Sequence, residues 1–147
     1  MSTDLRILSI DYGEKRIGLA LSDPMGVIAS GFGTIENTPD MYNRLGDIVR
    51  EQCVARIIVG LPLSLAGDHG DVTRRACAFA EKLGIVLGIP VEMLDERFTS
   101  TLATNTIRSL GVGRMKRRNK GKVDEIAAVI LLQDYLRMRG SQSELSR

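Results

Sequence analysis

Aromatic and histidine side chains are scarce in this chain of 147 residues: 4% are aromatic, tryptophan is absent, and His69 is the only histidine. With so few aromatic rings, recognition by extensive stacking on nucleobases is not expected. One histidine in a loop is weak evidence for proton transfer, so we interpret His69 as a solvated side chain.

Cysteine is also rare. Cys53 and Cys77 lack the Cys-x-x-Cys spacing of zinc sites and redox pairs, and each lies in an apolar segment with helical periodicity. We therefore expect buried free thiols, and neither a disulfide nor a zinc site. This pattern is typical of a protein from a reducing cytoplasm.

Long hydrophobic runs are missing. The longest apolar stretch covers residues 126–132, far short of the ~20 residues that a membrane-spanning helix needs. Residues 1–4 lead directly into a predicted strand, without the basic start and long apolar segment of a signal peptide. The sequence therefore predicts a soluble cytoplasmic protein with no membrane partner.

The composition suits one globular domain. The hydrophobic content of 44% is enough for a single core in a chain of this length. We predict one domain over residues 1–139 and a disordered tail over residues 140–147, which are polar and rich in serine. The formal net charge is only +2, so affinity for a polyanion must come from local clusters of charge.

Hydrophobic periodicity predicts a mixed sheet flanked by helices. Three antiparallel strands are expected over residues 5–11, 17–22 and 27–34, and two parallel strands over residues 56–60 and 91–94. The second strand has bulky residues on one face and small residues on the other. This order of strands and helices is typical of an α/β fold with a five-stranded mixed sheet.

Four helices are predicted between and after these strands. Thr38 can cap the first, with Pro39 at its first helical position. The others are expected over residues 71–83, where Gly84 ends the helix, over 100–110, and over 123–138.

Three carboxylates, on Asp11, Glu96 and Asp124, lie far apart in the sequence, yet each falls where a predicted strand or helix meets a loop. Ligands of such sheets bind beyond the carboxyl ends of the parallel strands, so these positions can converge on one site. Two carboxylates about 4 Å apart cost roughly 4 kcal/mol at an effective dielectric constant near 20. Convergence implies bound cations or raised pKa values, and a divalent metal is the simpler explanation.

Each acid also has an ordinary structural interpretation. Asp11 could belong to a simple hairpin turn. Strand alternation points Asp95 and Glu96 to opposite sides, so we expect one of them to reach the site and favour Glu96, with Asp95 acting as a cap or pairing with Arg97. On helical geometry Asp124 and Glu125 are both candidates, and either could act only as a favourable charge in the first turn. The residues alone leave these alternatives open.

Positive charge gathers immediately before Asp124, where the segment 114–122 carries six positive side chains in nine residues. A run of charges is usually solvated surface, but this one adjoins a helix N-terminus, whose dipole favours anions. We interpret it as an arm that binds phosphate groups. The candidate phosphate contacts of the whole chain are Lys15, Arg16, Arg97, Arg117, Arg118, Lys120 and Lys122.

Four stretches occur in this order between residues 10 and 136: IDYGEKRIGLALSD, IIVGLPLS, LDERFTS and NKGKVDEIAAVILLQDYL. As a set they closely resemble the YqgF/RuvX family of ribonuclease H-like proteins, which is similar in fold to RuvC-type Holliday-junction resolvases. The resemblance implies a ribonuclease H-like fold. It also implies that the family's acidic trio falls on Asp11, Glu96 and Asp124, which selects Asp124 over Glu125.

The family is generally described as a nuclease that processes the 5′ end of pre-16S ribosomal RNA. The resemblance therefore implies metal-dependent hydrolysis of phosphodiester bonds, with Mg²⁺ or Mn²⁺ as cofactor, an RNA precursor as substrate and ribosomal particles as partners. Asp11 would bridge two ions, with Glu96 and Asp124 each holding one. The chain departs from the family at Ser64 and Ala66, where members often carry Asn and Asp, and this concerns substrate contacts from that loop.

Three other functions compete with RNA processing. A resolvase-like DNA endonuclease would act as a symmetric dimer, because a four-way junction needs two cuts. A nucleic-acid-binding factor in ribosome assembly or transcription would need no catalysis, but clustered acids repel a polyanion unless metal is present. The Asp-x-Gly hairpin also occurs in the actin and sugar-kinase fold, which needs two domains where this chain has one. The choice between RNA and DNA, and between monomer and homodimer, is left open by the sequence.

Overall fold

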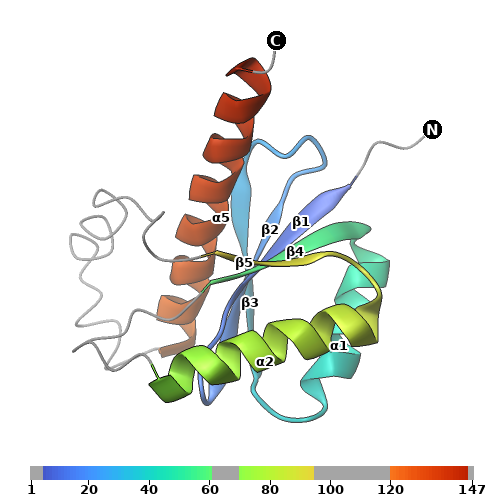
Figure 1. Cartoon of the computed structure of the whole chain (residues 1–147), viewed down its shortest axis with the longest axis vertical. Coiled ribbons are helices and arrows are strands. Elements are labelled where there is room, and N and C mark those ends of the chain that lie inside the picture. The colour runs from blue at the N-terminus through green and yellow to red at the C-terminus, as the bar shows by residue number, and fades with distance from the viewer. Residues whose placement is uncertain (1–4, 61–69, 95–119, 146–147) are drawn as a thin grey trace.

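A five-stranded sheet with helices on both faces forms the centre of the molecule (Figure 1). The computed structural model describes residues 5–60, 70–94 and 120–145. The strands are β1 (Arg6–Asp11), β2 (Arg16–Ser22), β3 (Ala29–Glu36), β4 (Val54–Gly60) and β5 (Val91–Leu94). The helices within the described residues are α1 (Met41–Glu51), α2 (Gly70–Leu87) and α5 (Lys120–Leu145).

The order of the strands across the sheet is β3-β2-β1-β4-β5. The first three are antiparallel neighbours, whereas β4 and β5 run parallel to β1. This arrangement confirms the predicted mixed sheet and α/β fold class. The parallel strands end side by side at one edge, where Asp11 pairs with Gly60 and Gly60 pairs with Leu94.

Strand alternation divides the apolar side chains between two cores. On one face, strand residues such as Ile10 and Leu19 pack with Leu45 of α1 and Phe79 of α2. On the opposite face, Ile7, Ala20 and Ile58 form a separate core with Ala128, Leu132 and other residues of α5. The helix α5 therefore covers one side of the sheet while α1 and α2 cover the other (Figure 1).

The helix α5 packs almost directly on the backbone of the sheet. A Cβ atom at Gly18 would overlap the carbonyl oxygen of Asp124, and one at Gly60 would lie 2.5 Å from Cδ2 of Leu131. At Gly18 the overlap is with backbone atoms, so this position requires glycine, whereas at Gly60 a larger residue would force the side chain of Leu131 to move. The small face predicted for the second strand is thus the face on which α5 lies.

The turn between β2 and β3 is organised by the carboxylate of Asp23. Its Oδ1 accepts hydrogen bonds from the backbone N–H groups of Ile28, at 2.8 Å, and Val27, at 2.7 Å. These two residues therefore belong to the turn, and β3 covers Ala29–Glu36 instead of the predicted 27–34. Because the bonds stabilise the charged carboxylate, they lower the pKa of Asp23 below its usual 3.8.

The first two helices differ from the prediction at their ends. The helix α1 begins after Asp40, which makes no side-chain capping bond, instead of at Pro39. The helix α2 was predicted to stop at Gly84, but it passes through this residue and ends before Gly88. Gly88 has a positive φ of 68°, the left-handed conformation that terminates helices, whereas Gly84 keeps its helical conformation.

The last helix is longer than predicted. It continues to Leu145, past the expected end near Met138, so the prediction of a disordered tail was wrong for residues 140–145. Gly140 does not have the positive φ that would end the helix there. No helix in the described ranges, α5 included, is both long enough and apolar enough to cross a membrane.

The prediction of buried cysteines was also wrong, because Cys53 and Cys77 are both exposed free thiols. Cys53 has a positive φ of 55° in the connection between α1 and β4. Cys77 lies on the outer side of α2, whose inward side is formed by Ala76, Phe79 and Ala80. Apolar neighbours in the sequence do not place a residue in the core when the helix turns it outward.

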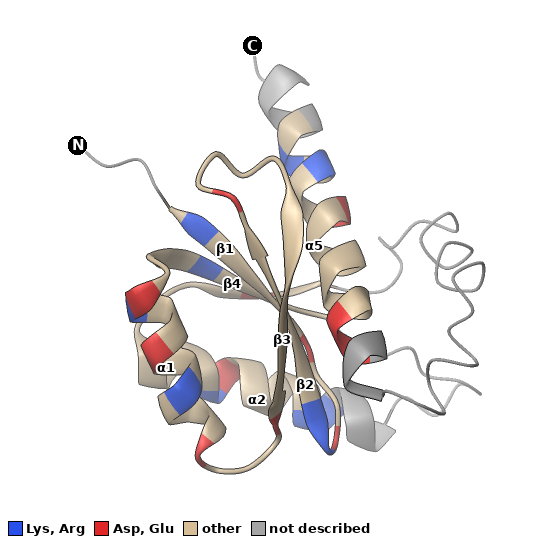
Figure 2. Cartoon of the chain, turned by 180° about the vertical axis from the view of Figure 1, so that it is seen from behind, with Lys and Arg blue, Asp and Glu red and all other residues tan. Residues whose placement is uncertain are grey.

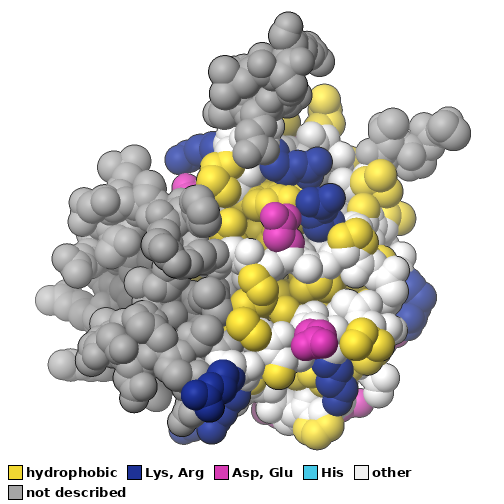
Figure 3. Space-filling view, in the orientation of Figure 1, with side chains coloured by type: hydrophobic (Ala, Val, Ile, Leu, Met, Phe, Trp, Pro, Cys, Tyr) yellow, Lys and Arg dark blue, Asp and Glu magenta, His cyan; other side chains and the backbone are white. Residues whose placement is uncertain are grey.

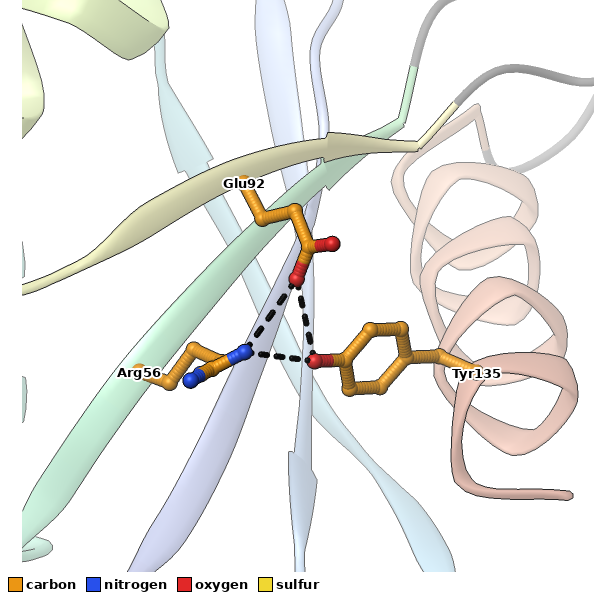
Figure 4. A network of polar contacts seen from close by, with 3 residues as sticks. All are labelled: Arg56, Glu92 and Tyr135. Atoms are coloured by element: carbon orange, nitrogen blue, oxygen red, sulfur yellow. Dashed lines mark hydrogen bonds and ion pairs between the residues drawn. The ribbon is translucent and has the colours of Figure 1, made fainter. Parts of the chain in front are cut away.

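A polar network of three side chains links α5 to the strands β4 and β5 (Figure 4). The hydroxyl of Tyr135 donates to Oε2 of Glu92 at 3.0 Å and accepts a hydrogen bond from Nη1 of Arg56 at 3.1 Å. The same Nη1 lies 3.3 Å from Oε2 of Glu92. Each of the three groups contacts the other two, so β4, β5 and α5 are joined at one point.

We predict that Tyr135→Phe lowers the free energy of unfolding by about 1 kcal/mol, because it removes two hydrogen bonds to half-exposed charged groups and leaves the ring in the core. Urea denaturation of both proteins measures this difference. Tyr42→Phe is the matched control, because within the described residues its hydroxyl makes no hydrogen bond. An equal loss in both variants would show that the network contributes nothing of its own.

The lowered pKa of Asp23 predicts a pH dependence of stability. A group whose pKa is depressed by folding stabilises the folded state above its unfolded pKa, and this contribution disappears as the pH falls through the folded pKa. We expect the stability advantage of the wild type over Asp23→Asn to shrink as the pH falls below 3.8. Urea denaturation at several pH values tests this, and parallel profiles for the two proteins would contradict it.

Candidate active site

Asp11 is the last residue of β1, at the carboxyl end of the strand. Its neighbours across the sheet are both glycines, Gly18 on β2 and Gly60 on β4. Because residues two apart in a strand share a face, Asp11 points to the same side as Ile7, which packs against α5. The carboxylate is therefore directed to the α5 side of the sheet at the edge where the parallel strands end.

Asp124 reaches the same place from the first turns of α5. Its carbonyl oxygen lies against Gly18, the direct partner of Asp11 in the antiparallel ladder. Residues that face each other in such a ladder have Cα atoms roughly 4.5 to 5.5 Å apart. Asp11 and the backbone of Asp124 are thus both next to Gly18, although 113 positions separate the two acids in the sequence. The side chain of Asp124 is 29% exposed, so it is open to solvent.

Among the described residues, Arg16 forms an ion pair with one of these acids. Its Nε lies 3.7 Å from Oδ2 of Asp124. The same Nε is buried and has no hydrogen-bond acceptor among the described residues. Lys15, the other predicted phosphate contact in this turn, is exposed. Arg16 therefore places a positive charge beside Asp124, while Lys15 faces the solvent.

Glu125, the alternative to Asp124, is directed to a different part of the sheet. Its Oε2 accepts a hydrogen bond of 2.6 Å from the backbone N–H of Gly33 on β3. A Cβ atom at Gly31 would come within 2.7 Å of the same carboxylate. The carboxylate of Glu125 thus attaches α5 to the outer strand of the sheet, on the side of β2 away from Asp11.

Ser9 was not predicted as part of the site. It lies one alternation step before Asp11, on the same face of β1, and is fully buried. Its hydroxyl has no hydrogen-bond partner in the part of the chain that the structure describes. The signal in the sequence was a polar residue in a strand that is otherwise apolar, two positions before a candidate acid.

The other predicted site residues lie outside the described residues. Glu96 follows the end of β5 by two positions, and nothing in the structure tests its place in the trio or the alternative of Asp95. The same holds for His69, Ser64, Ala66, Arg97, Arg117 and Arg118, for the side chains of Lys120 and Lys122, and for the helix predicted over residues 100–110.

The two described acids fit a divalent metal ion by the chemistry of their donors. Both supply carboxylate oxygens, the ligands that Mg²⁺ and Mn²⁺ prefer. Within the described ranges no three Asp, Glu, His or Cys side chains gather as a metal site, and the predicted third ligand, Glu96, is outside those ranges. Asp11 and Asp124 are thus two of the three ligands that the sequence predicts.

Charge on the described surface is distributed in small groups. Figure 2 shows Lys, Arg, Asp and Glu mainly at strand ends and along the helices. On the face seen in Figure 3, basic and acidic side chains of the described residues are interspersed, without a broad area of one sign. Attraction of a polyanion to these residues would therefore depend on individual positions such as Arg16.

Comparison with known proteins gives a consistent set of similarities. The family model described as "RuvX: Holliday junction resolvase" matches residues 5–138. A "Putative pre-16S rRNA nuclease" from Porphyromonas gingivalis is 44% identical over 132 residues, which cover 89% of this chain and 95% of that protein. A protein of the same name from Chloroflexus aggregans is 43% identical over 135 residues, covering 90% and 94% of the two chains.

Among solved structures, RuvC from Thermus thermophilus in complex with a Holliday junction substrate superposes with a TM-score of 0.55. The sequences are 14% identical, and the match covers 91% of this chain and 96% of that one. At this identity the likeness concerns the fold alone. It confirms the predicted ribonuclease H-like architecture.

The contact between Gly18 and α5 predicts a specific effect of added volume. In Gly18→Ala the new methyl group would overlap the carbonyl oxygen of Asp124, so the start of α5 must move away from β2. We expect a loss of about 1 to 3 kcal/mol in the free energy of unfolding, measured by urea denaturation.

Gly140→Ala in α5 is the control for this substitution. No atom lies within 4 Å of the position that its Cβ would take. Alanine in place of glycine inside a helix should raise stability by up to about 1 kcal/mol. A Gly18→Ala protein as stable as the wild type would show that α5 does not press on β2 at this point.

Proposed function

The chain belongs to the RuvX family, and from this membership we propose that it is a metal-dependent nuclease that hydrolyses phosphodiester bonds in precursor 16S ribosomal RNA. Support for a nuclease comes from relatives that are more than 40% identical over most of both chains and carry that name. The structural observation that carries the proposal is that Asp11 pairs with Gly18 at the carboxyl end of β1 and that the carbonyl oxygen of Asp124 lies against the same glycine.

In this proposal Asp11, Glu96 and Asp124 would hold Mg²⁺ or Mn²⁺ through their carboxylate oxygens. When bound, divalent ions would act as Lewis acids at the scissile phosphate and would lower the pKa of bound water, so that hydroxide is available at neutral pH. The carboxylates of the chain fix the position of the ions and do not themselves attract the substrate. Without cations, Asp11 and Asp124 would repel a phosphodiester, so binding of substrate and of metal is coupled.

Basic residues hold the substrate in the same proposal. Arg16 lies 3.7 Å from the carboxylate of Asp124, so its guanidinium can contact a phosphate oxygen beside the acids. We assign Arg97, Arg117, Arg118, Lys120 and Lys122 as further phosphate contacts from the sequence, with Lys15 in a solvated position nearby. A precursor RNA of the ribosome would meet the protein in the cytoplasm, and the ribosomal particle itself is a proposed partner.

Cleavage of branched DNA is the second candidate function. It is favoured by the description of the family model, which names Holliday junction resolvases. A resolvase acts as a symmetric dimer that makes paired cuts, whereas processing of an RNA end can be done by a monomer. The substrate and the pattern of cuts distinguish the two functions.

We predict that Asp11→Asn and Asp124→Asn each reduce the rate of cleavage by at least about 100-fold, because each removes a charge that would hold the metal. A factor of ten in rate corresponds to about 1.4 kcal/mol of transition-state stabilisation. The measurement is the rate of cutting of a labelled 5′ precursor fragment of 16S rRNA and of a four-way DNA junction, in Mg²⁺, Mn²⁺ or chelator. Asp47→Asn, an exposed acid on α1, is the control and should retain full activity.

Each outcome of this assay has a defined meaning. RNA cutting that requires metal and both acids supports the proposal, and paired symmetric cuts in the junction alone would replace it with a resolvase. Binding without cutting in any metal would support a non-catalytic assembly factor. Full activity of Asp11→Asn would overturn the assignment of the site.

A further inference from the structure

A polar hollow of about 460 Å³ lies next to the candidate active site and has no part in the function proposed so far. Its walls come from β2, from the end of β3 and from the start of α1. The polar residues that line it are Arg16, Thr34, Glu36, Thr38, Asp40 and Arg44.

The hollow is continuous with the acid site through Arg16. This residue lines the hollow and also lies 3.7 Å from the carboxylate of Asp124. Its buried Nε–H has no acceptor among the described residues, although a buried donor without an acceptor costs free energy. An anion in the hollow would instead contact the exposed part of the Arg16 side chain, which is 34% accessible and forms one of the walls.

The wall of the hollow is tied to the loop that follows Asp11. Asn37, between β3 and α1, donates from its backbone N–H to the carbonyl oxygen of Lys15 at 2.9 Å. Its side-chain Nδ2 donates to the carbonyl oxygen of Gly13 at 2.7 Å. These two bonds fix the β3–α1 connection, which lines the hollow, relative to the loop between β1 and β2.

The second cation of the hollow, Arg44, is held only weakly. Its side chain is 63% exposed, and its Nε lies 3.9 Å from Oδ2 of Asp40. Exposed pairs of this kind contribute roughly 0 to 1 kcal/mol. A phosphate group can therefore draw the guanidinium away from Asp40 at little cost, and an arginine binds a phosphate through two parallel hydrogen bonds.

The two acids of the hollow limit where an anion can bind. Glu36 faces Arg16 directly across the β2–β3 ladder, and Asp40 lies beside Arg44. The hollow is therefore not a broad positive surface, and a polyanion finds favourable contacts only at the two arginines. The hydroxyl groups of Thr34 and Thr38 add donors that carry no charge.

We propose that this hollow binds a backbone phosphate of the nucleic-acid strand next to the scissile bond, with Arg16 and Arg44 as its charged contacts and Thr38 as a neutral one. The inference rests on the proposed nuclease function and specifies the path of the substrate, which runs from the acids past Arg16 to the start of α1. Arg44 is thereby a substrate-binding residue that neither the motifs nor the relatives' names indicate.

The test compares two arginines on the same helix. Arg44→Gln removes the contact in the hollow, whereas Arg50→Gln removes an exposed arginine paired with Asp47 at the other end of α1. Both variants lose one positive charge and one exposed ion pair, so a general effect of net charge acts on both alike. The dissociation constant for a labelled 5′ precursor fragment of 16S rRNA is measured by fluorescence anisotropy in Ca²⁺, a divalent ion that carboxylate oxygens also bind. The salt concentration is varied between 50 and 200 mM, and a denaturing gel checks that the fragment stays intact.

For Arg44→Gln we expect binding about 5- to 10-fold weaker at low salt, and a slope of log K against log salt reduced by about 1, the value for one lost phosphate contact. Arg50→Gln should keep the slope of the wild type. Thr38→Val should weaken binding by about 2- to 3-fold without changing the slope, because it removes a neutral hydrogen bond.

An unchanged slope in Arg44→Gln, or an equal change in Arg50→Gln, would overturn the inference while leaving metal-dependent cleavage intact. The wild type could bind RNA but cut nothing in any metal, while Arg44→Gln reduces the salt slope of binding by one unit. This result would support phosphate binding in the hollow and overturn the proposed nuclease function. If the wild type binds no RNA but binds a four-way junction with the same Arg44 dependence, the phosphate contact stands and the substrate becomes DNA. Binding of neither nucleic acid would overturn both proposals.

Discussion

The close contact of one helix with the bare backbone of the sheet is the constraint on which the rest of this structure depends. The helix α5 lies on Gly18, where its backbone at Asp124 meets the strand directly, and on Gly60, where the side chain of Leu131 fills the space. At Gly18 its position is thus set by backbone atoms, which cannot change rotamer. The Tyr135 network fixes the same helix further along, and Glu125 attaches it to β3. This arrangement places the backbone of Asp124 against Gly18, the ladder partner of Asp11.

Much of the sheet could be predicted from the sequence, because hydrophobic alternation reports directly which strand faces are buried. The bulky and small faces of the second strand correspond to the two cores, and Asp11 lies at the strand end where it was expected. Helix ends were less predictable. Glycine often ends a helix, yet Gly84 and Gly140 lie inside helices and have no positive φ, whereas Gly88 takes the left-handed conformation just after α2. Conformation cannot be read from the residue type. The prediction that Cys77 is buried was wrong for a similar reason, since its exposure depends on which side of α2 faces the sheet.

The candidate site was predictable where it follows from strand ends and was not predictable where it follows from contacts between distant segments. Spacing left Asp124 and Glu125 equivalent, although the structure directs Glu125 to Gly33 and brings Asp124 against Gly18. Arg44 gave no signal in the sequence, because an arginine on the polar side of a helix is usually solvated surface. Its relation to Arg16 arises only when the end of β3 returns the chain beside the loop after Asp11.

The bond between Glu125 and Gly33 has a further consequence for the behaviour of the protein in concentrated solution. The strand β3 is an edge strand of the sheet, and an edge strand has backbone groups with which a strand of a second chain can pair. At Gly33 the φ of 82° interrupts the extended conformation, and the N–H group is already bonded to Glu125 within the same molecule. The register with β2 is also irregular between Gly18 and Ala20. A strand of a second molecule therefore cannot form a continuous ladder along β3. The carboxylate of Glu125, which attaches α5 to the sheet, thus also disfavours association through this edge strand.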